Sequence, residues 1–210
     1  MDEHTTGRII VTLHEEYGAG AEAIGPLLAQ ALGVPFVDRA VSSETFEAAA
    51  EREAVEENFF ERFLSSFTPM PSMEGDVTWA LEIRTDHEIA EEGASRLQEL
   101  VTDGAVVLGR NATIVLAEEP RALHLKLVAP VADRIARAAT SAGITPERAQ
   151  RRQEREDRVR TDLARRLYRW DPTASDNFDI VLNTSIFSPQ QVTEIVLAAY
   201  RVKYPNGTSS

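Results

Sequence analysis

A chain of 210 residues can bury the core of one globular domain, and its composition, with 43% hydrophobic residues, is ordinary for such a domain. The formal net charge of −12 argues against binding to nucleic acid through a general basic surface, and the absence of cysteine excludes disulfide bonds and thiolate metal sites. No window approaches the roughly 20 apolar residues of a membrane span, and the N-terminus lacks the pattern of a signal peptide. We therefore expect one cytoplasmic domain over residues 1–210, with neither nucleic acid nor membrane as a partner.

Short apolar runs without polar alternation predict five buried strands separated by helical patterns. The runs lie at residues 9–13, 35–37, 105–109, 123–128 and 179–183. Such runs, joined by helices, are typical of a parallel sheet that is covered on both faces. The sequence thus predicts a three-layer α/β fold with a five-stranded parallel sheet flanked by helices.

Capping residues mark the expected helix ends. The apolar spacing within residues 24–32 predicts a helix that Gly33 ends. Pro130 is expected at the first position of the helix after the fourth strand, and the Thr-Pro pair at 145–146 opens an arginine-rich helix in the same way. The Ser-Pro-Gln-Gln sequence at 188–191 predicts a capping box for the last helix.

The first strand runs into a glycine-bearing turn that a helical pattern follows at once, which is the layout of a phosphate-binding loop. In the pattern G-x-x-x-x-G-K-[ST], Gly20 fits, with Gly18 beside it. Glu15 takes the place of the first glycine, Ala21 that of the lysine, and Glu22 that of the Ser/Thr that would hold Mg²⁺. The residues expected to bind the nucleotide are Tyr17, Gly18, Ala19, Gly20, Ala21 and Glu22.

Charge is distributed unevenly along the chain. Residues 44–61 are rich in glutamate, whereas residues 134–169 are rich in arginine. The arginines suit phosphate oxygens, although a solvated helix with i,i+4 ion pairs is an equally good interpretation for most of them. The two lysines, Lys126 and Lys203, lie far from the turn in sequence. Positive charge for a transferring phosphoryl group must therefore come mostly from arginine.

Four motifs in the correct order resemble those of the cytidylate kinase-like family. They lie at residues 14–24, 33–39, 104–117 and 178–184. The third contains Leu-Gly-Arg where that family carries Val-Gly-Arg, and the fourth, Phe-Asp-Ile-Val-Leu-Asn-Thr, is similar to the family's Tyr-Asp-Leu-x-x-Asn-Thr. The resemblance implies a P-loop nucleoside-monophosphate kinase fold, with a helical acceptor region at about 41–100 and a lid at about 145–175.

Three arginines are the catalytic candidates that the resemblance implies. Arg110 stands where cytidylate kinases carry an arginine for the acceptor phosphate, at the carboxyl end of a strand. Arg160 completes an Asp-x-x-Arg motif that begins at Asp157, and Arg152 lies two turns earlier on roughly the same helix face. The implied role of such lid arginines is to close over the phosphates.

The acceptor site and the metal site are less well defined by the resemblance. The residues expected to bind the acceptor are Asp38, Arg39, Arg110, Asn111 and Asp157. Asp38 and Arg39 have an alternative interpretation, because they could instead cap the helix that follows. Leu108 stands where cytidylate kinases have an aspartate that would organise Mg²⁺, and Asn111 replaces a second one, so no metal ligand is assigned.

The implied reaction is the transfer of the γ-phosphoryl group of ATP to CMP or dCMP with Mg²⁺, and two alternatives stay open. The family carries arginines where this chain has Glu15 and Glu22, and carboxylates near a triphosphate repel it. A protein that binds a nucleotide or a partner without turnover is therefore the first alternative. The second is a kinase of another small acceptor, because residues 41–100 contribute almost nothing to the resemblance.

Overall fold

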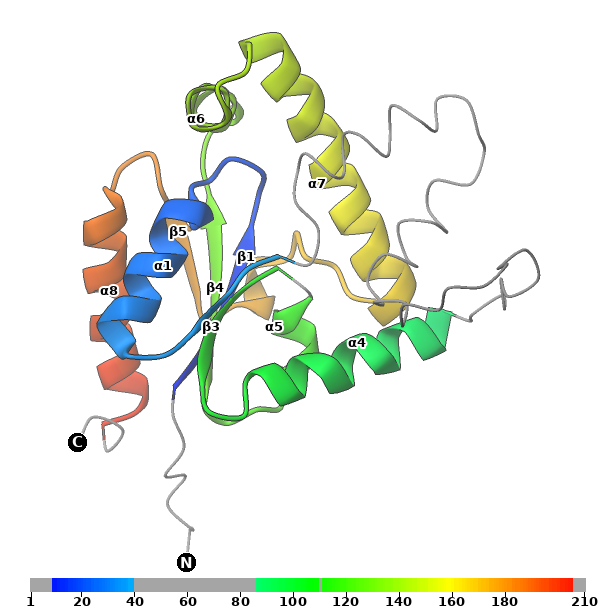
Figure 1. The fold of residues 1–210 in the computed structure, drawn as a ribbon, viewed down its shortest axis with the longest axis vertical. Coiled ribbons are helices and arrows are strands. Elements are labelled where there is room, and N and C mark those ends of the chain that lie inside the picture. The colour runs from blue at the N-terminus through cyan, green and yellow to red at the C-terminus, as the bar shows by residue number, and fades with distance from the viewer. Residues whose placement is uncertain (1–8, 40–85, 110, 206–210) are drawn as a thin grey trace, which may run out of the picture.

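The computed structural model describes residues 9–39, 86–109 and 111–205. Figure 1 shows its elements, with gaps in the numbering at the residues left undescribed. In chain order they are β1 (Ile10–Glu15), α1 (Ala21–Leu32), β2 (Phe36–Val37), α4 (Asp86–Leu100), β3 (Ala105–Leu108), α5 (Ala112–Val115), β4 (Ala122–Val128), α6 (Val131–Ala142), α7 (Pro146–Tyr168), the 3-10 turn η1 (Ser175–Asn177), β5 (Ile180–Asn183) and α8 (Pro189–Lys203).

The five strands form one sheet in the order β2-β3-β1-β4-β5, and every neighbouring pair is parallel. This confirms the predicted five-stranded parallel sheet. The central strand β1 pairs Leu13 with Leu108 of β3 and Glu15 with Leu127 of β4. In open parallel sheets ligands bind beyond the carboxyl ends of the strands, where the strand order reverses. Glu15, the last residue of β1, lies at the centre of that edge.

Helices cover both faces of the sheet, and the alternation along β1 assigns each side chain to one face. Figure 1 shows α1 and α8 on one face and α4 and α5 on the other. Val11 and Leu13 belong to the core under α1 and α8, whereas Ile10 belongs to the core under α4 and α5. Because side chains alternate with a period of two, Glu15 follows Val11 and Leu13 onto the α1 face. Its carboxylate is thereby directed toward the start of α1.

The helix ends agree with the capping signals, with one shift. Gly33 ends α1 in the left-handed conformation, the side chain of Thr145 caps α7, and Ser188 and Gln191 form the capping box of α8. Pro130 is the N-cap of α6 and not its first helical residue. Its ψ of 138° is extended, so the helix starts one residue later than predicted, at Val131.

Most of the expected acceptor region lies outside the described residues, which resume only at α4. The expected lid region contains α7, a long helix that packs on α6 and α4 and rises beyond the carboxyl edge of the sheet in Figure 1. Among the described helices, none combines the length and the apolar character that crossing a membrane requires.

A cluster of aromatic side chains packs the segment between α7 and β5 against the sheet. The ring of His14 lies 6.0 Å from that of Trp170 and 5.4 Å from that of Phe178, measured between centroids. Lys126, next to His14 on β4, is buried; its Nζ donates a 2.9 Å hydrogen bond to the carbonyl of Pro172 and lies 5.6 Å from the centre of the Phe178 ring. The lysine is therefore engaged in holding this segment.

We predict that His14 makes folding depend on pH. Its pKa falls from an ordinary value of 6.5 to about 3, mainly because the imidazole is removed from water and also because Lys126 and Arg160 repel a second positive charge. Below about pH 6.5 His14 is protonated in the unfolded chain but stays neutral in the folded chain. The free energy of unfolding therefore decreases as the pH falls below neutral. Between about pH 7 and about pH 5.5, the free energy of unfolding should therefore fall by about 1 kcal/mol less in the His14→Phe variant than in the wild type.

Urea denaturation at the two pH values measures this difference. His87→Gln is the control, because His87 is exposed on α4. Equal pH dependence in the wild type and the His14→Phe variant would contradict the assignment.

Candidate functional site

The turn between β1 and α1 has the backbone of an anion-binding loop. Gly18 and Gly20 adopt the left-handed conformation, with φ of 80° and 96°. A Cβ atom on Gly18 would lie 2.4 Å from the carbonyl oxygen of Arg134, so this position also lacks room for a side chain. Successive amides in such a turn point toward one concavity, and the start of a helix adds the positive end of its dipole. The glycines singled out in the sequence are therefore required by the turn.

The carboxylate of Glu15 fills this concavity. The backbone N–H groups of Gly20 and Ala21 both donate to Oε1 of Glu15, at 2.9 and 3.0 Å. Glu15 is only 6% exposed, so these bonds form away from bulk water. The loop thus holds a negatively charged oxygen, supplied by its own chain.

Arg39 neutralises the second oxygen of that carboxylate. Its Nη2 lies 3.0 Å from Oε2 of Glu15 and 3.1 Å from Oε1 of Glu22. Burial lowers the pKa of the Arg39 guanidinium, but Glu15 and Glu22 outweigh burial and hold it above its ordinary value. Asp38, exposed beside it, accepts a 2.7 Å hydrogen bond from the backbone N–H of Arg39. Arg39 was expected to bind the acceptor, and the structure places it beside the loop between β1 and α1, in contact with Glu15 and Glu22.

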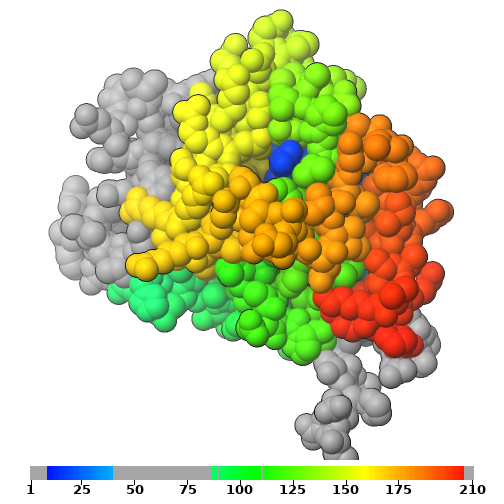
Figure 2. All heavy atoms as spheres, turned by 180° about the vertical axis from the view of Figure 1, so that it is seen from behind, coloured from blue at the N-terminus to red at the C-terminus, as the bar shows by residue number. Residues whose placement is uncertain are grey.

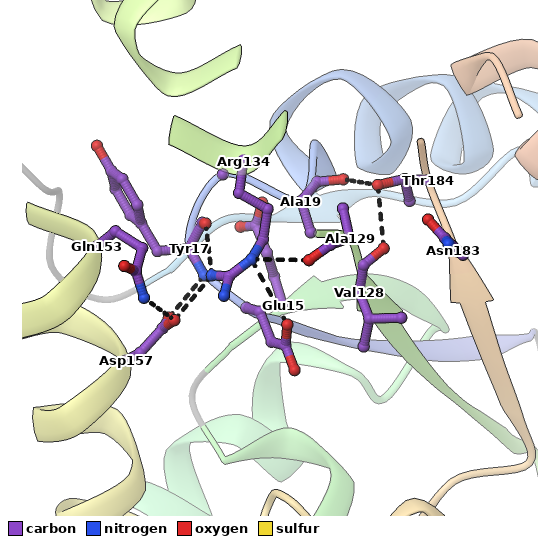
Figure 3. Close-up of polar contacts among 12 residues, drawn as sticks. Glu15, Tyr17, Ala19, Val128, Ala129, Arg134, Gln153, Asp157, Asn183 and Thr184 are labelled. Carbon is purple, nitrogen blue, oxygen red and sulfur yellow. Dashed lines mark hydrogen bonds and ion pairs between the residues drawn. The ribbon is translucent and has the colours of Figure 1, made fainter. Parts of the chain in front are cut away.

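Asp157 joins α7 to the loop (Figure 3). Its Oδ1 accepts a 2.8 Å hydrogen bond from the backbone N–H of Tyr17, and its Oδ2 accepts from Arg134 at 2.7 Å and from Gln153 at 2.8 Å. Arg134, buried at the start of α6, also donates to the carbonyls of Tyr17 and Ala129, at 3.0 and 3.1 Å. Asp157, expected to bind the acceptor, therefore contacts the loop and ties it to two helices.

A second arginine of α6 holds the next part of the loop. Arg137 donates to the carbonyl of Gly18 at 2.8 Å and to that of Thr184 at 3.1 Å. The hydroxyl of Thr184 in turn donates to the carbonyl of Ala19 at 2.7 Å, beside the carbonyl of Val128 (Figure 3). The sequence placed Arg134 and Arg137 in an arginine-rich stretch without individual roles. Their i,i+3 spacing after the fourth strand is the signal that could have identified the pair.

One face of α7 carries an alternating row of charges. Arg152 and Glu156 are buried, and Arg160 forms an ion pair with Glu156. Burial and the charge of Glu156 raise the pKa of the Tyr17 hydroxyl, while a hydrogen bond with Arg152 opposes that rise. In the described part of the chain, Oε1 of Glu156 has no hydrogen-bond partner. The two expected lid arginines therefore engage protein groups near the loop, and their contact with phosphates stays a prediction.

The carboxyl end of β3 meets the same edge of the sheet. Gly109 donates a 2.9 Å backbone hydrogen bond to Leu13 of β1, and Asn111 is the N-cap of α5 with a φ of 52°. Arg110 lies between them in sequence but outside the described residues. Leu108 is buried, in keeping with its apolar character. Within residues 9–39, 86–109 and 111–205, no three histidine, aspartate or glutamate side chains gather as a metal site would require.

The opposite side of the molecule shows how α6 and α7 frame the site. In Figure 2 a small part of the N-terminal segment, in dark blue, is visible between the atoms of these two helices and the orange segment that precedes α8. From this side, the N-terminal segment is therefore seen next to α6 and α7, the helices that supply Arg134, Arg137 and Asp157.

Comparison with known proteins places this chain in a family. The sequence profile of the cytidylate kinase-like family matches residues 10–186. A cytidylate kinase of Methanopyrus kandleri is 26% identical over 191 residues, which cover 91% of this chain and 92% of that protein. A uronate isomerase of Corynebacterium glutamicum is 29% identical over 154 residues, which cover 73% of this chain but only 30% of that protein. A solved structure from Eubacterium ventriosum shares the fold, with a TM-score of 0.62, 16% identity and coverage of 93% of this chain and 99% of that one.

We predict that Gly18 tolerates no side chain. Gly18→Ala places a Cβ against a backbone carbonyl and imposes the left-handed conformation on alanine, so the free energy of unfolding should fall by about 3 kcal/mol. Gly33→Ala is the matched control, because Gly33 has the same sign of φ but nothing within 4 Å of its Cβ position. It should cost about 1 kcal/mol. Urea denaturation measures both, and equal losses would refute the close approach of Arg134.

We predict that Asp157 stabilises the loop. Asp157→Ala removes the 2.7 Å ion pair of the buried Arg134, leaving among the described residues only the longer contact of 3.6 Å with Glu16, and it leaves the N–H of Tyr17 without its acceptor, so the free energy of unfolding should fall by about 2 kcal/mol. Asp162→Ala, on an exposed position of the same helix, should cost less than about 0.5 kcal/mol. Chemical denaturation measures both variants. If Asp157→Ala lowers the free energy of unfolding no more than Asp162→Ala does, the contacts of Asp157 with the loop do not stabilise the protein.

Proposed function

The chain belongs to the cytidylate kinase-like family, and we propose from this premise that it transfers the γ-phosphoryl group of ATP to the phosphate of CMP or dCMP. One observation of the site carries the proposal. At the carboxyl end of the central strand, two loop N–H groups converge at 2.9 and 3.0 Å on a single anionic oxygen. A phosphate oxygen of a nucleotide has the charge and the hydrogen-bonding capacity that this arrangement accepts.

The nucleotide is assigned to the loop and to the first turn of α1. The left-handed glycines, Gly18 and Gly20, let the backbone curl around a phosphate without a Cβ atom in the way. Arg134, Arg137 and Asp157 keep this curl fixed by binding its outward-facing groups. Such preorganisation matters because phosphoryl transfer depends mainly on positioning and on stabilisation of charge.

The acceptor is assigned to the neighbouring strand end and to α7. Arg110 and Asn111, which follow β3, are proposed to bind the acceptor phosphate, and Arg152 and Arg160 to neutralise the charge of the transferred group. In the reaction an oxygen of the acceptor phosphate forms a bond to the γ-phosphorus, the bond from that phosphorus to the bridging oxygen breaks, and ADP leaves. ATP supplies the phosphoryl group, and Mg²⁺ bound to its phosphates lowers their charge.

A second candidate function is binding of a nucleotide or a partner without turnover. The position of Glu15 favours it, because a carboxylate already satisfies the loop N–H groups that a phosphate would use. A different acceptor is the third possibility. The match to part of a uronate isomerase makes a sugar acid the first alternative acceptor to examine.

We predict that the purified protein, given CMP and MgATP, produces equal amounts of CDP and ADP. Arg110→Ala should lower the rate by roughly 100-fold, because one charge-stabilising group is lost from the transfer. Arg201→Ala, an exposed change in α8, should leave the rate unaltered. Anion-exchange chromatography of the nucleotides measures both products.

The same assay separates the alternatives. ADP that forms without CDP, only when a uronate is added and without an equal release of free phosphate, would point to the other acceptor. Neither product at high enzyme concentration would contradict turnover and leave the binding function.

A further inference from the structure

We propose that Glu15 is an internal ligand of the phosphate site, which a nucleotide phosphate must displace, and that Arg39 is the counterion that passes from Glu15 to that phosphate. This inference deepens the proposed function and rests on it for the identity of the natural ligand. The exchange itself concerns only the loop, its amides and two side chains.

The position of Glu15 is that of a bound anion. One carboxylate oxygen accepts from Gly20 and Ala21 at 2.9 and 3.0 Å, and the other lies 3.0 Å from the guanidinium of Arg39. The Glu15 side chain is 4% exposed, so both oxygens are held inside the protein. Two amide donors and one cation around a buried anion are the elements of a phosphate-binding site.

Four amides of the loop already have acceptors within the protein, and three of them donate to carboxylates. Besides the two that Glu15 occupies, the N–H of Tyr17 donates to Asp157 at 2.8 Å, and that of Ala19 donates to the carbonyl of Glu16 at 2.9 Å. An N–H group has one hydrogen to donate, so a phosphate can gain the donors of Gly20 and Ala21 only when Glu15 releases them.

Charge makes the two anions mutually exclusive. Around the Arg39 guanidinium lie the carboxylates of Glu15 at 3.0 Å, Glu22 at 3.1 Å and Asp38 at 3.8 Å. A phosphate added to this group would bring further negative charge into a partly desolvated space, where repulsion is poorly screened. The departure of Glu15 removes one charge and frees the loop donors in the same movement.

Arg39 supplies the positive charge that the loop itself lacks. Ala21 stands at the lysine position of the phosphate-loop pattern. Lys126 of β4 does not replace that lysine, because its Nζ donates a hydrogen bond to the carbonyl of Pro172. Arg39 reaches the loop from the end of β2, and a guanidinium binds phosphate oxygens in the same forked way as it binds carboxylate. When Glu15 leaves, Arg39 is already in place beside the amides.

The test measures binding of inorganic pyrophosphate by isothermal titration calorimetry, without Mg²⁺ and without acceptor. Glu15→Ala should bind pyrophosphate at least about tenfold more tightly than the wild type, because the competing anion is gone. Glu15→Gln, which keeps the shape and removes the charge, should bind at least about threefold more tightly. Glu22→Gln is the matched control: it removes a charge from the same arginine but no occupant from the loop, and should gain less than about threefold.

The role of Arg39 is tested in the variant that lacks the Glu15 carboxylate. The double change Glu15→Ala with Arg39→Ala should lose most of the gained affinity. In ¹H–¹⁵N spectra of the Glu15→Ala variant, pyrophosphate should shift the amide signals of Gly20 and Ala21, and the same concentration should leave those of the wild type in place. If Glu15→Ala fails to fold, Glu15→Gln decides the question by the same measurements.

Two results overturn the inference: an affinity of the folded Glu15 variant no higher than that of the wild type, or a gain that Glu22→Gln reproduces in full. The outcome is separable from that of the kinase assay. Tighter pyrophosphate binding in the Glu15 variants without CDP formation would support the internal ligand and reject turnover. CDP formation by the wild type, without tighter pyrophosphate binding in the Glu15 variants, would support turnover and reject the internal ligand.

Discussion

The site depends on how the loop between β1 and α1 is held: two arginines of α6 bind the carbonyls of its first residues, and the amides of Gly20 and Ala21, at its end, share one buried acceptor. Arg134 and Arg137 bind the carbonyls of Tyr17 and Gly18, and this fixes the path of the backbone. The N–H groups of the next residues must then find an acceptor, because an unpaired buried amide costs about as much as a lost hydrogen bond. Glu15 meets that demand in this structure.

This constraint links α7 to the loop. Asp157 is the common partner of Arg134 and the Tyr17 amide, so the long helix, the start of α6 and the loop form one connected network. Burial of Arg134 is tolerated because its donors meet the carbonyls of Tyr17 and Ala129 as well as a carboxylate. A movement of α7 toward a ligand must therefore either carry the loop with it or exchange these partners.

The sequence predicted the fold well, because apolar runs and capping residues are local signals. The five strands, the Thr145 cap and the Ser188 capping box needed only their neighbours in the chain. The face of β1 on which Glu15 lies also follows from strand alternation. The pairing of Glu15 with Arg39 does not, since it joins residues 24 positions apart and depends on where β2 lies in the sheet. Arg134 was not predicted individually: its i,i+3 spacing with Arg137 places both on one side of α6, but the carbonyls that they bind cannot be read from the sequence.

The row of charges on α7 gives the lid candidates a physical context. Arg160 pairs with Glu156, and Arg152 binds the hydroxyl of Tyr17, so both already hold protein acceptors close to the loop. An arginine gains by turning to a phosphate only if its former partner stays satisfied or is itself released. Turning Arg160 away would remove the ion pair of Glu156, whose other oxygen has no hydrogen-bond partner among the described residues. The exchange proposed for Glu15 and Arg39 does not itself involve these arginines, so their redirection toward a phosphate would be a separate step. Because Asp157 ties α7 to the loop, a displacement of the loop would also act on the helix that carries these arginines.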